Sequence, residues 1–65
     1  MKKSQLAEVL EDREYHVVEH PTFMCVFKHG NFICSIRREE ESRKYFNTIN
    51  VPEAFRHLVT TYGDM

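Results

Sequence analysis

The sequence predicts a small α+β domain with one antiparallel sheet and helices packed on one face of it. Two features predict this fold: helical spacing of apolar residues near both ends of the chain, and β-prone residues around a glycine turn between them. The chain has 65 residues, 42% of them hydrophobic, which suffices for one core and is too little for two. We therefore expect a single domain over residues 1–65, in α-β-β-β(-β)-α order.

The first helix is predicted from a short apolar stripe that follows a capping serine. Leu6, Val9 and Leu10 stand at positions i, i+3 and i+4, so they share one helical face. Ser4 can accept a hydrogen bond from an N–H group of the first turn. A helix this short is marginal on its own in water, so we expect it to pack against the rest of the chain.

Three strands are expected between the helices. Residues 15–18 are β-prone, and Pro21 favours an extended conformation for the residue before it. Residues 22–28 and 32–38 form two further candidate strands around His29, Gly30 and Asn31. The hairpin turn can use His29-Gly30 or Gly30-Asn31, since both are turn sequences, and the sequence leaves the choice open.

Both turns pair odd positions of one hairpin strand with even positions of the other, which divides the side chains into two faces. One face has no charged residue, and we expect the helices to cover it. Its members are Phe23, Cys25, Phe27, Phe32, Cys34 and Ile36. The opposite face then carries Met24, Val26 and Ile33 toward solvent, together with Lys28 and Arg37.

The charged segment 38–44 fits two structures. As a hairpin tip, it places Glu39 and Glu40 across from Lys44 and Arg43. As a helix, it places the same residues in pairs at i and i+4. We favour the hairpin and a fourth strand over residues 45–49, because that stretch is β-rich and lacks a helical apolar stripe.

The last helix has the clearest sequence pattern. Pro52 suits its first turn, and Gly63 can follow its carboxyl end. Four apolar residues at i, i+3, i+4 and i+7 form one continuous face, and they are Phe55, Leu58, Val59 and Tyr62. We expect Phe55, Leu58 and Val59 to be nearly inaccessible, together with Phe27 and Cys34.

Two motifs suggest a metal, and neither fits one. Residues 16–20 match the H-x-x-E-H pattern of zinc proteases, but on a strand His16 and His20 lie about 13 Å apart, too far to share an ion. Cys25, His29 and Cys34 lack the short knuckle spacing of structural zinc sites. We expect no enzymatic activity, no bound metal and no cofactor. With the His29-Gly30 turn, Cys25 would lie directly opposite Cys34, close enough for a cross-strand disulfide.

Composition excludes several further classes of function. The net charge is −1, and no apolar run approaches the roughly 20 residues of a membrane span. No glycine-rich loop is present to bind phosphate. Two cysteines are too few for a disulfide scaffold, so we expect a reduced, cytoplasmic protein that does not bind membranes.

A partly apolar second sheet face points to protein binding. We expect a non-enzymatic protein-interaction or regulatory module that binds a protein partner or forms a homodimer. The candidate partner-binding residues are Met24, Val26, Ile33 and Phe46.

Nucleic-acid binding through a basic and aromatic sheet face is the alternative. Its candidate residues are Lys28, Arg37, Arg38, Arg43 and Lys44. The element order is similar to that of the double-stranded RNA-binding fold, but the lysine-rich start of that fold's last helix is replaced here by residues 51–55. The likeness therefore assigns no residue a role.

Overall fold

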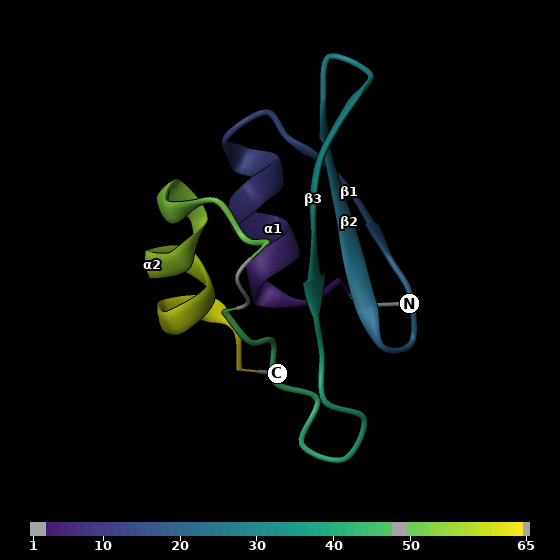
Figure 1. The fold of residues 1–65 in the computed structure, drawn as a ribbon, viewed down its shortest axis with the longest axis vertical. Coiled ribbons are helices and arrows are strands. Elements are labelled where there is room, and N and C mark those ends of the chain that lie inside the picture. Colours follow the sequence, from purple (N-terminus) through teal and green to yellow (C-terminus); the bar gives the residue numbers. More distant parts are fainter. Residues whose placement is uncertain (1–2, 48–49, 65) are drawn as a thin grey trace.

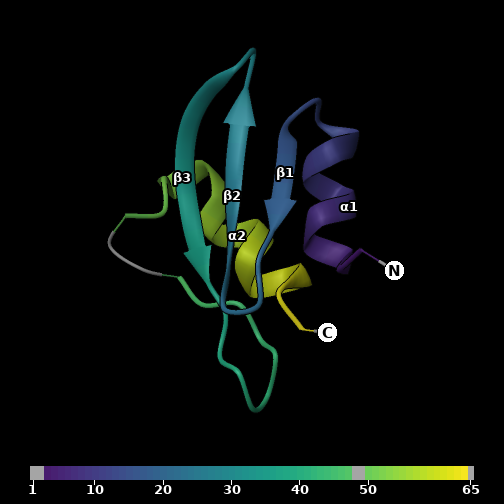
Figure 2. The ribbon, with the colours of Figure 1, turned by 90° about the vertical axis from the view of Figure 1, so that its right-hand side faces the viewer.

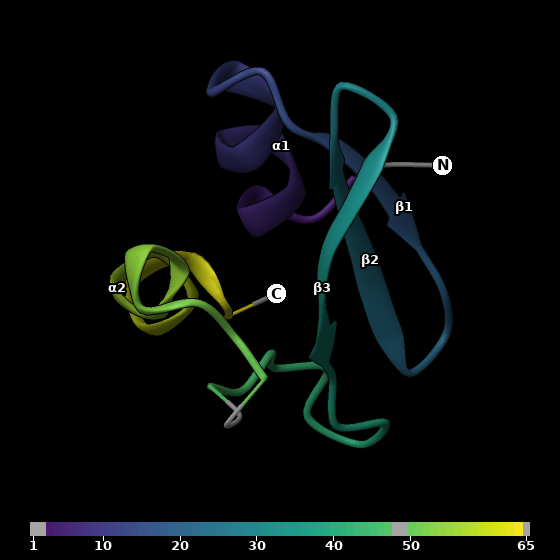
Figure 3. The same cartoon turned by 45° about the horizontal axis from the view of Figure 1, so that its top comes forward.

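The computed structural model describes residues 3–47 and 50–64. Its elements are α1 (Gln5–Asp12), β1 (His16–Glu19), β2 (Phe23–Lys28), β3 (Asn31–Arg37) and α2 (Glu53–Tyr62). The central strand β2 runs antiparallel to both β1 and β3. Both helices lie on one side of the sheet (Figures 1 and 3), whereas Figure 2 looks onto the side that neither helix covers. The expected α+β fold is confirmed.

Helix α1 begins as its sequence predicts, whereas Pro52, expected in the first turn of α2, is the cap residue that precedes it; both helices pack through their apolar faces. The Ser4 hydroxyl accepts a hydrogen bond of 3.2 Å from the Ala7 N–H, and Leu6 and Leu10 are fully buried.

In the described part of the chain, neither helix has the length and apolar character needed to cross a membrane.

The carboxyl end of α2 requires a glycine because of a close approach. Gly63 has a φ of −75°, which any residue can adopt, so conformational freedom is not the reason. A Cβ atom there would lie 2.3 Å from the Val59 carbonyl oxygen and 3.2 Å from that of Tyr45. The Gly63 carbonyl also accepts a hydrogen bond from the Tyr45 N–H, so the end of α2 is fixed to the segment after β3.

The β2–β3 hairpin turns at His29-Gly30. Lys28 pairs with Asn31, and Phe27 with Phe32, which leaves His29 and Gly30 as the two turn residues. Their φ angles of 52° and 80° are both in the left-handed region, as a type I′ turn requires. The first of the two expected turns is therefore the one that forms.

A β-bulge follows this turn and changes the pairing. After Phe27 and Phe32, the next pair is Val26 with Cys34, so Ile33 is an extra residue in β3. Beyond the bulge, even positions of β2 pair with even positions of β3, and Met24 lies opposite Ile36. Neither register expected from the sequence contains this pairing.

The bulge overturns the expected face assignment for β2. Met24 and Val26, which were expected to face solvent, are fully buried under the helices. Phe27, which was expected in the core, is only half-buried, and Phe32 is 59% exposed. Phe23 and Cys25 are likewise half-buried on the uncovered side. The expectation failed because it assumed a hairpin without a bulge, and a one-residue shift moves every later side chain to the other face.

The core lies between the helices and the inner side of the sheet. The burial of Cys34, Phe55, Leu58 and Val59 was expected and is confirmed. The buried apolar residues of the described chain are Leu6, Ala7, Leu10, Val17, Met24, Val26, Cys34, Ile36, Tyr45, Val51, Phe55, Leu58 and Val59.

The segment after β3 forms the expected hairpin tip and not the alternative helix. Arg38 and Tyr45 form an isolated antiparallel bridge, and the Glu39 N–H donates to the Lys44 carbonyl at 2.9 Å. The expected fourth strand over residues 45–49 is wrong in its described part, where Tyr45 alone has strand pairing and 46–47 have none. Residues 48–49 lie outside the described residues.

The reversed face assignment makes a testable prediction about stability. Met24→Ala should lower the free energy of unfolding by about 2–5 kcal/mol, because it leaves a cavity in the core. Phe32→Ala should change it by less than about 1 kcal/mol, because that ring is mostly in water already. Urea denaturation of the three proteins measures both effects. A Phe32→Ala loss as large as the Met24→Ala loss would contradict the assignment.

Candidate interaction surface

The uncovered side of the sheet, which we call the outer face, carries side chains from all three strands. Cross-strand pairs place these side chains in three rows: His16 with Phe27 and Phe32, Val18 with Cys25 and Ser35, and His20 with Phe23 and Arg37. Ile33, the bulge residue, is an exposed neighbour of the first row. The outer face is these ten residues.

Aromatic contacts organise both ends of the outer face. The Phe27 and Phe32 rings meet edge to face with centroids 5.7 Å apart, and His16 lies 6.1 Å from Phe27. At the other end, His20 stacks on Phe23 at 4.4 Å. Smaller residues occupy the middle row, so the rings stand at either end of the face.

The outer face is mostly apolar and nearly free of formal charge, and its polar members are His16, His20, Ser35 and Arg37. Phe32 is 59% exposed, Ile33 39% and Val18 36%. Arg37 is the one Lys, Arg, Asp or Glu residue among the ten. Contiguous apolar side chains in water, with a charge only at the margin, are typical of a surface that another molecule covers.

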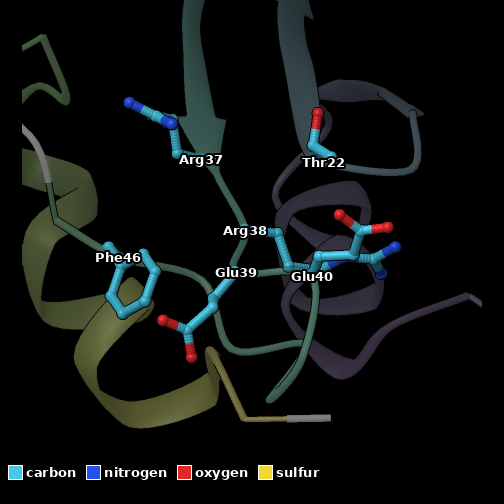
Figure 4. Close-up of a pocket in the computed structure, with 6 residues that line it drawn as sticks. All are labelled: Thr22, Arg37, Arg38, Glu39, Glu40 and Phe46. Atoms are coloured by element: carbon cyan, nitrogen blue, oxygen red, sulfur yellow. The ribbon is translucent and has the colours of Figure 1, made fainter.

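A pocket adjoins the outer face at its Arg37 corner (Figure 4). It has a volume of about 500 Å³ and is lined by Thr22, Arg37, Arg38, Glu39, Glu40 and Phe46. Figure 4 shows Arg37 and Phe46 on one side of it and Thr22 and Glu40 on the other. Two arginines and two glutamates balance in charge, so the lining does not favour an anion over a cation.

Arg38 has a structural role beside this pocket. Its Nη2 donates a hydrogen bond of 2.8 Å to the Pro21 carbonyl, and its guanidinium lies 5.6 Å from the Tyr45 ring centroid. Its buried Nε atom has no hydrogen-bond partner among the described residues. Arg38 therefore links the β1–β2 connection to the segment after β3.

The four predicted partner-binding residues do not form one surface. Met24 and Val26 are in the core, Ile33 lies on the outer face, and Phe46, 43% exposed, lines the pocket. The apolar side chains that do share the outer face include the exposed Phe32 and the half-buried Phe23, Cys25 and Phe27, all of which the sequence pattern assigned to the core.

The five predicted nucleic-acid-binding residues are spread over the molecule. Lys28 lies at the turn end of β2, where its Nζ is 4.4 Å from the Tyr15 ring centroid and donates to the Arg13 carbonyl. Arg37 pairs with Phe23, which lies five residues from Lys28 along β2. Lys28 and Arg37 are therefore about 17 Å apart at strand spacing.

Two others of the five, Arg43 and Lys44, lie beyond the sheet. Lys44 pairs with Asp64 at 3.8 Å, and Arg43 has a φ of 62° in the hairpin tip. Both follow Arg38 in that tip and project beyond the end of β3, while Lys28 lies at the opposite end of the sheet. The structure does not gather the five cations on one face.

A buried polar cluster supports the sheet from the core side. Glu19, at the end of β1, accepts hydrogen bonds from the Ser4 hydroxyl and, at 3.1 Å, from the Tyr45 hydroxyl. Burial, followed by the nearby Glu19 charge, raises the pKa of the Tyr45 phenol above its ordinary value of 10.0. Glu19 thus fixes the start of α1 and the segment after β3 to one edge of the sheet.

The histidines and cysteines that suggested a metal site lie apart from one another. His16 lies on β1, as expected, and His20 follows its end. Among residues 3–47 and 50–64, no three His, Cys, Asp or Glu side chains are grouped so as to hold a metal ion. Cys25 pairs with Ser35 on the outer face, whereas Cys34 pairs with Val26 in the core. The Cys25–Cys34 pair expected for this turn does not form, because the bulge shifts it, and both cysteines are free.

Comparison of the chain with protein-family models, curated proteins and solved structures gives no match. The outer face is therefore interpreted from its own chemistry. That chemistry is apolar contact area, aromatic rings and one accessible thiol position, with charge confined to one corner.

The buried thiol makes stability fall at alkaline pH. Burial, with a smaller contribution from Cys25, raises the pKa of Cys34 from 9.0 to about 11. Because the folded-state pKa is the higher one, the contribution of Cys34 is fully present below pH 9 and is lost as pH rises to about 11. From pH 8 to pH 10, the native protein should lose more unfolding free energy than Cys34→Ala in urea titrations. Equal losses would contradict this prediction.

Proposed function

We propose that this chain is a non-enzymatic protein-interaction module, with a regulatory role, that binds its protein partner through the outer face. The observation that carries the proposal is the contiguous apolar surface on three strands, which no described helix covers. Each Å² of apolar surface removed from water contributes about 25 cal/mol, so covering this face favours association. Arg37 and the pocket beside it supply the polar margin that protein interfaces have.

A non-catalytic role is supported by the two side chains whose pKa values are shifted. Cys34 and Tyr45 both have raised pKa values, which keep the thiol and the phenol neutral. A catalytic thiol needs the opposite shift, because the thiolate is the reactive form. Both side chains also face the core, away from the outer face and its adjoining pocket.

Single-stranded nucleic acid is the second candidate partner. It is favoured by the exposed ring of Phe32 and the half-buried ring of Phe27 beside it, since bases stack on aromatic side chains presented by a sheet. Phosphate binding also needs cations beside those rings, and Arg37 alone supplies one on the outer face. This shortage of cations makes a protein the preferred partner.

A partner bound by the outer face should be lost when charge is placed there. Tagged full-length chain from its native host should retain a protein after nuclease treatment, and Phe32→Asp should lower its recovery at least tenfold. Thr61→Asp is the matched control, because it adds the same charge at an exposed position of α2. Calorimetry with the purified partner should reproduce the difference between the two variants.

Three results would contradict the proposed function. They are equal recovery with Phe32→Asp, equal loss with Thr61→Asp, and bound material that nuclease removes. The last, with an affinity that falls steeply as salt rises, would identify a nucleic-acid-binding protein instead. In that case Arg37→Glu should abolish binding.

A further inference from the structure

We propose that the outer face binds a second copy of this chain, packed face to face with Cys25 at the two-fold axis. This inference rests on the proposed function and specifies its partner. It is argued from the position of Cys25 and from the charge pattern of the outer face, and the size of that face sets the expected strength of the dimer.

Cys25 is the central residue of the outer face. Across the strands it lies between Val18 and Ser35, and along β2 it lies between Phe23 and Phe27. A two-fold axis through the centre of the face therefore brings two Cys25 side chains together, whichever way the strands of the two copies cross. The aromatic groups at both ends of the face then meet side chains of the second copy.

The charge pattern suits a second copy better than a charged partner. Without an acidic residue on the outer face, a basic partner would find no counterion there, and an acidic one would find only Arg37. Arg37 occupies a corner of the face. An axis along or across the strands keeps the two Arg37 side chains at least about 10 Å apart, near the screening length in physiological salt. In either of these two arrangements, the copies meet with little like-charge repulsion.

The size of the face sets the strength of the dimer. Three strands and the seven residues of β3 span about 14 Å by 23 Å, or about 330 Å² for each copy. A stable interface buries about 800 Å² for each partner. We therefore expect a weak, reversible dimer, with a dissociation constant in the micromolar range or above.

The two cysteines allow this arrangement to be tested by cross-linking. Cys25 is half-buried on the outer face, while Cys34 is 3% exposed in the core. Sheets that pack face to face lie about 10 Å apart, so a short bismaleimide can join two Cys25 thiols across the interface. Cys34 is shielded from the reagent in the folded protein, and Cys25→Ser provides the matched control.

The experiment measures self-association of the full chain at protein concentrations from about 10 µM to about 1 mM, the range in which a weak dimer forms. Sedimentation equilibrium should show a dimer fraction that rises with concentration. Bismaleimide should give at least tenfold more covalent dimer with the native chain than with Cys25→Ser. Phe32→Asp and Val18→Asp, both at exposed positions, should abolish association and keep the circular dichroism spectrum of the folded chain, and Thr61→Asp should change neither.

Two outcomes would overturn the inference. One is a monomer at 1 mM without Cys25 cross-links, and the other is a dimer that persists in both Phe32→Asp and Val18→Asp. The proposed function would survive the first outcome if a different purified protein binds the native chain and not Phe32→Asp. It would fail with the inference if neither a second copy nor any other protein depends on Phe32.

Discussion

The side chains of a β-strand alternate between two faces, so a shift of one residue in pairing transfers a whole strand from one face to the other. In this chain the shift occurs at Ile33, two residue pairs after the His29-Gly30 turn. It pairs Val26 with Cys34 and directs both toward the helices. Phe27, on the other side of the shift, is left facing water with Phe32. The core and the outer face both depend on this one extra residue.

The two sides of the sheet differ in how firmly they are held. On the core side, fully buried Met24 and Ile36 pack beneath both helices, and Glu19 joins Ser4 to Tyr45 by hydrogen bonds. On the outer face, the rings contact one another and water. The core holds the rings of Phe55 and Tyr45, and aliphatic side chains occupy most of its other positions. Because of the bulge, one side of the sheet is tightly packed and the other side has apolar area that remains uncovered.

The helices could be predicted from the sequence because their signals are local. Ser4 accepts the capping hydrogen bond that its position suggests, and Phe55 and Val59 are buried as their spacing predicts. For the β2–β3 turn, the sequence allows His29-Gly30 or Gly30-Asn31, and the structure has the first. The faces of β2 could not be predicted, because residues 23–27 are all apolar and either set could fill a core. Phe32 and Ile33 within β3 are both β-prone, so neither residue type indicates that a bulge forms there.

The size of the chain connects this fold to its proposed use. Two helices of eight and ten residues are enough to cover one face of a three-stranded sheet, and both lie on the same side. A sheet with one wet face normally carries polar residues there, which makes the exposed ring of Phe32 and the half-buried ring of Phe27 unusual. Their apolar area stabilises the folded chain little while it faces water, and contributes fully when another surface covers it. A second copy would supply the missing layer and add burial that a chain of 65 residues lacks alone.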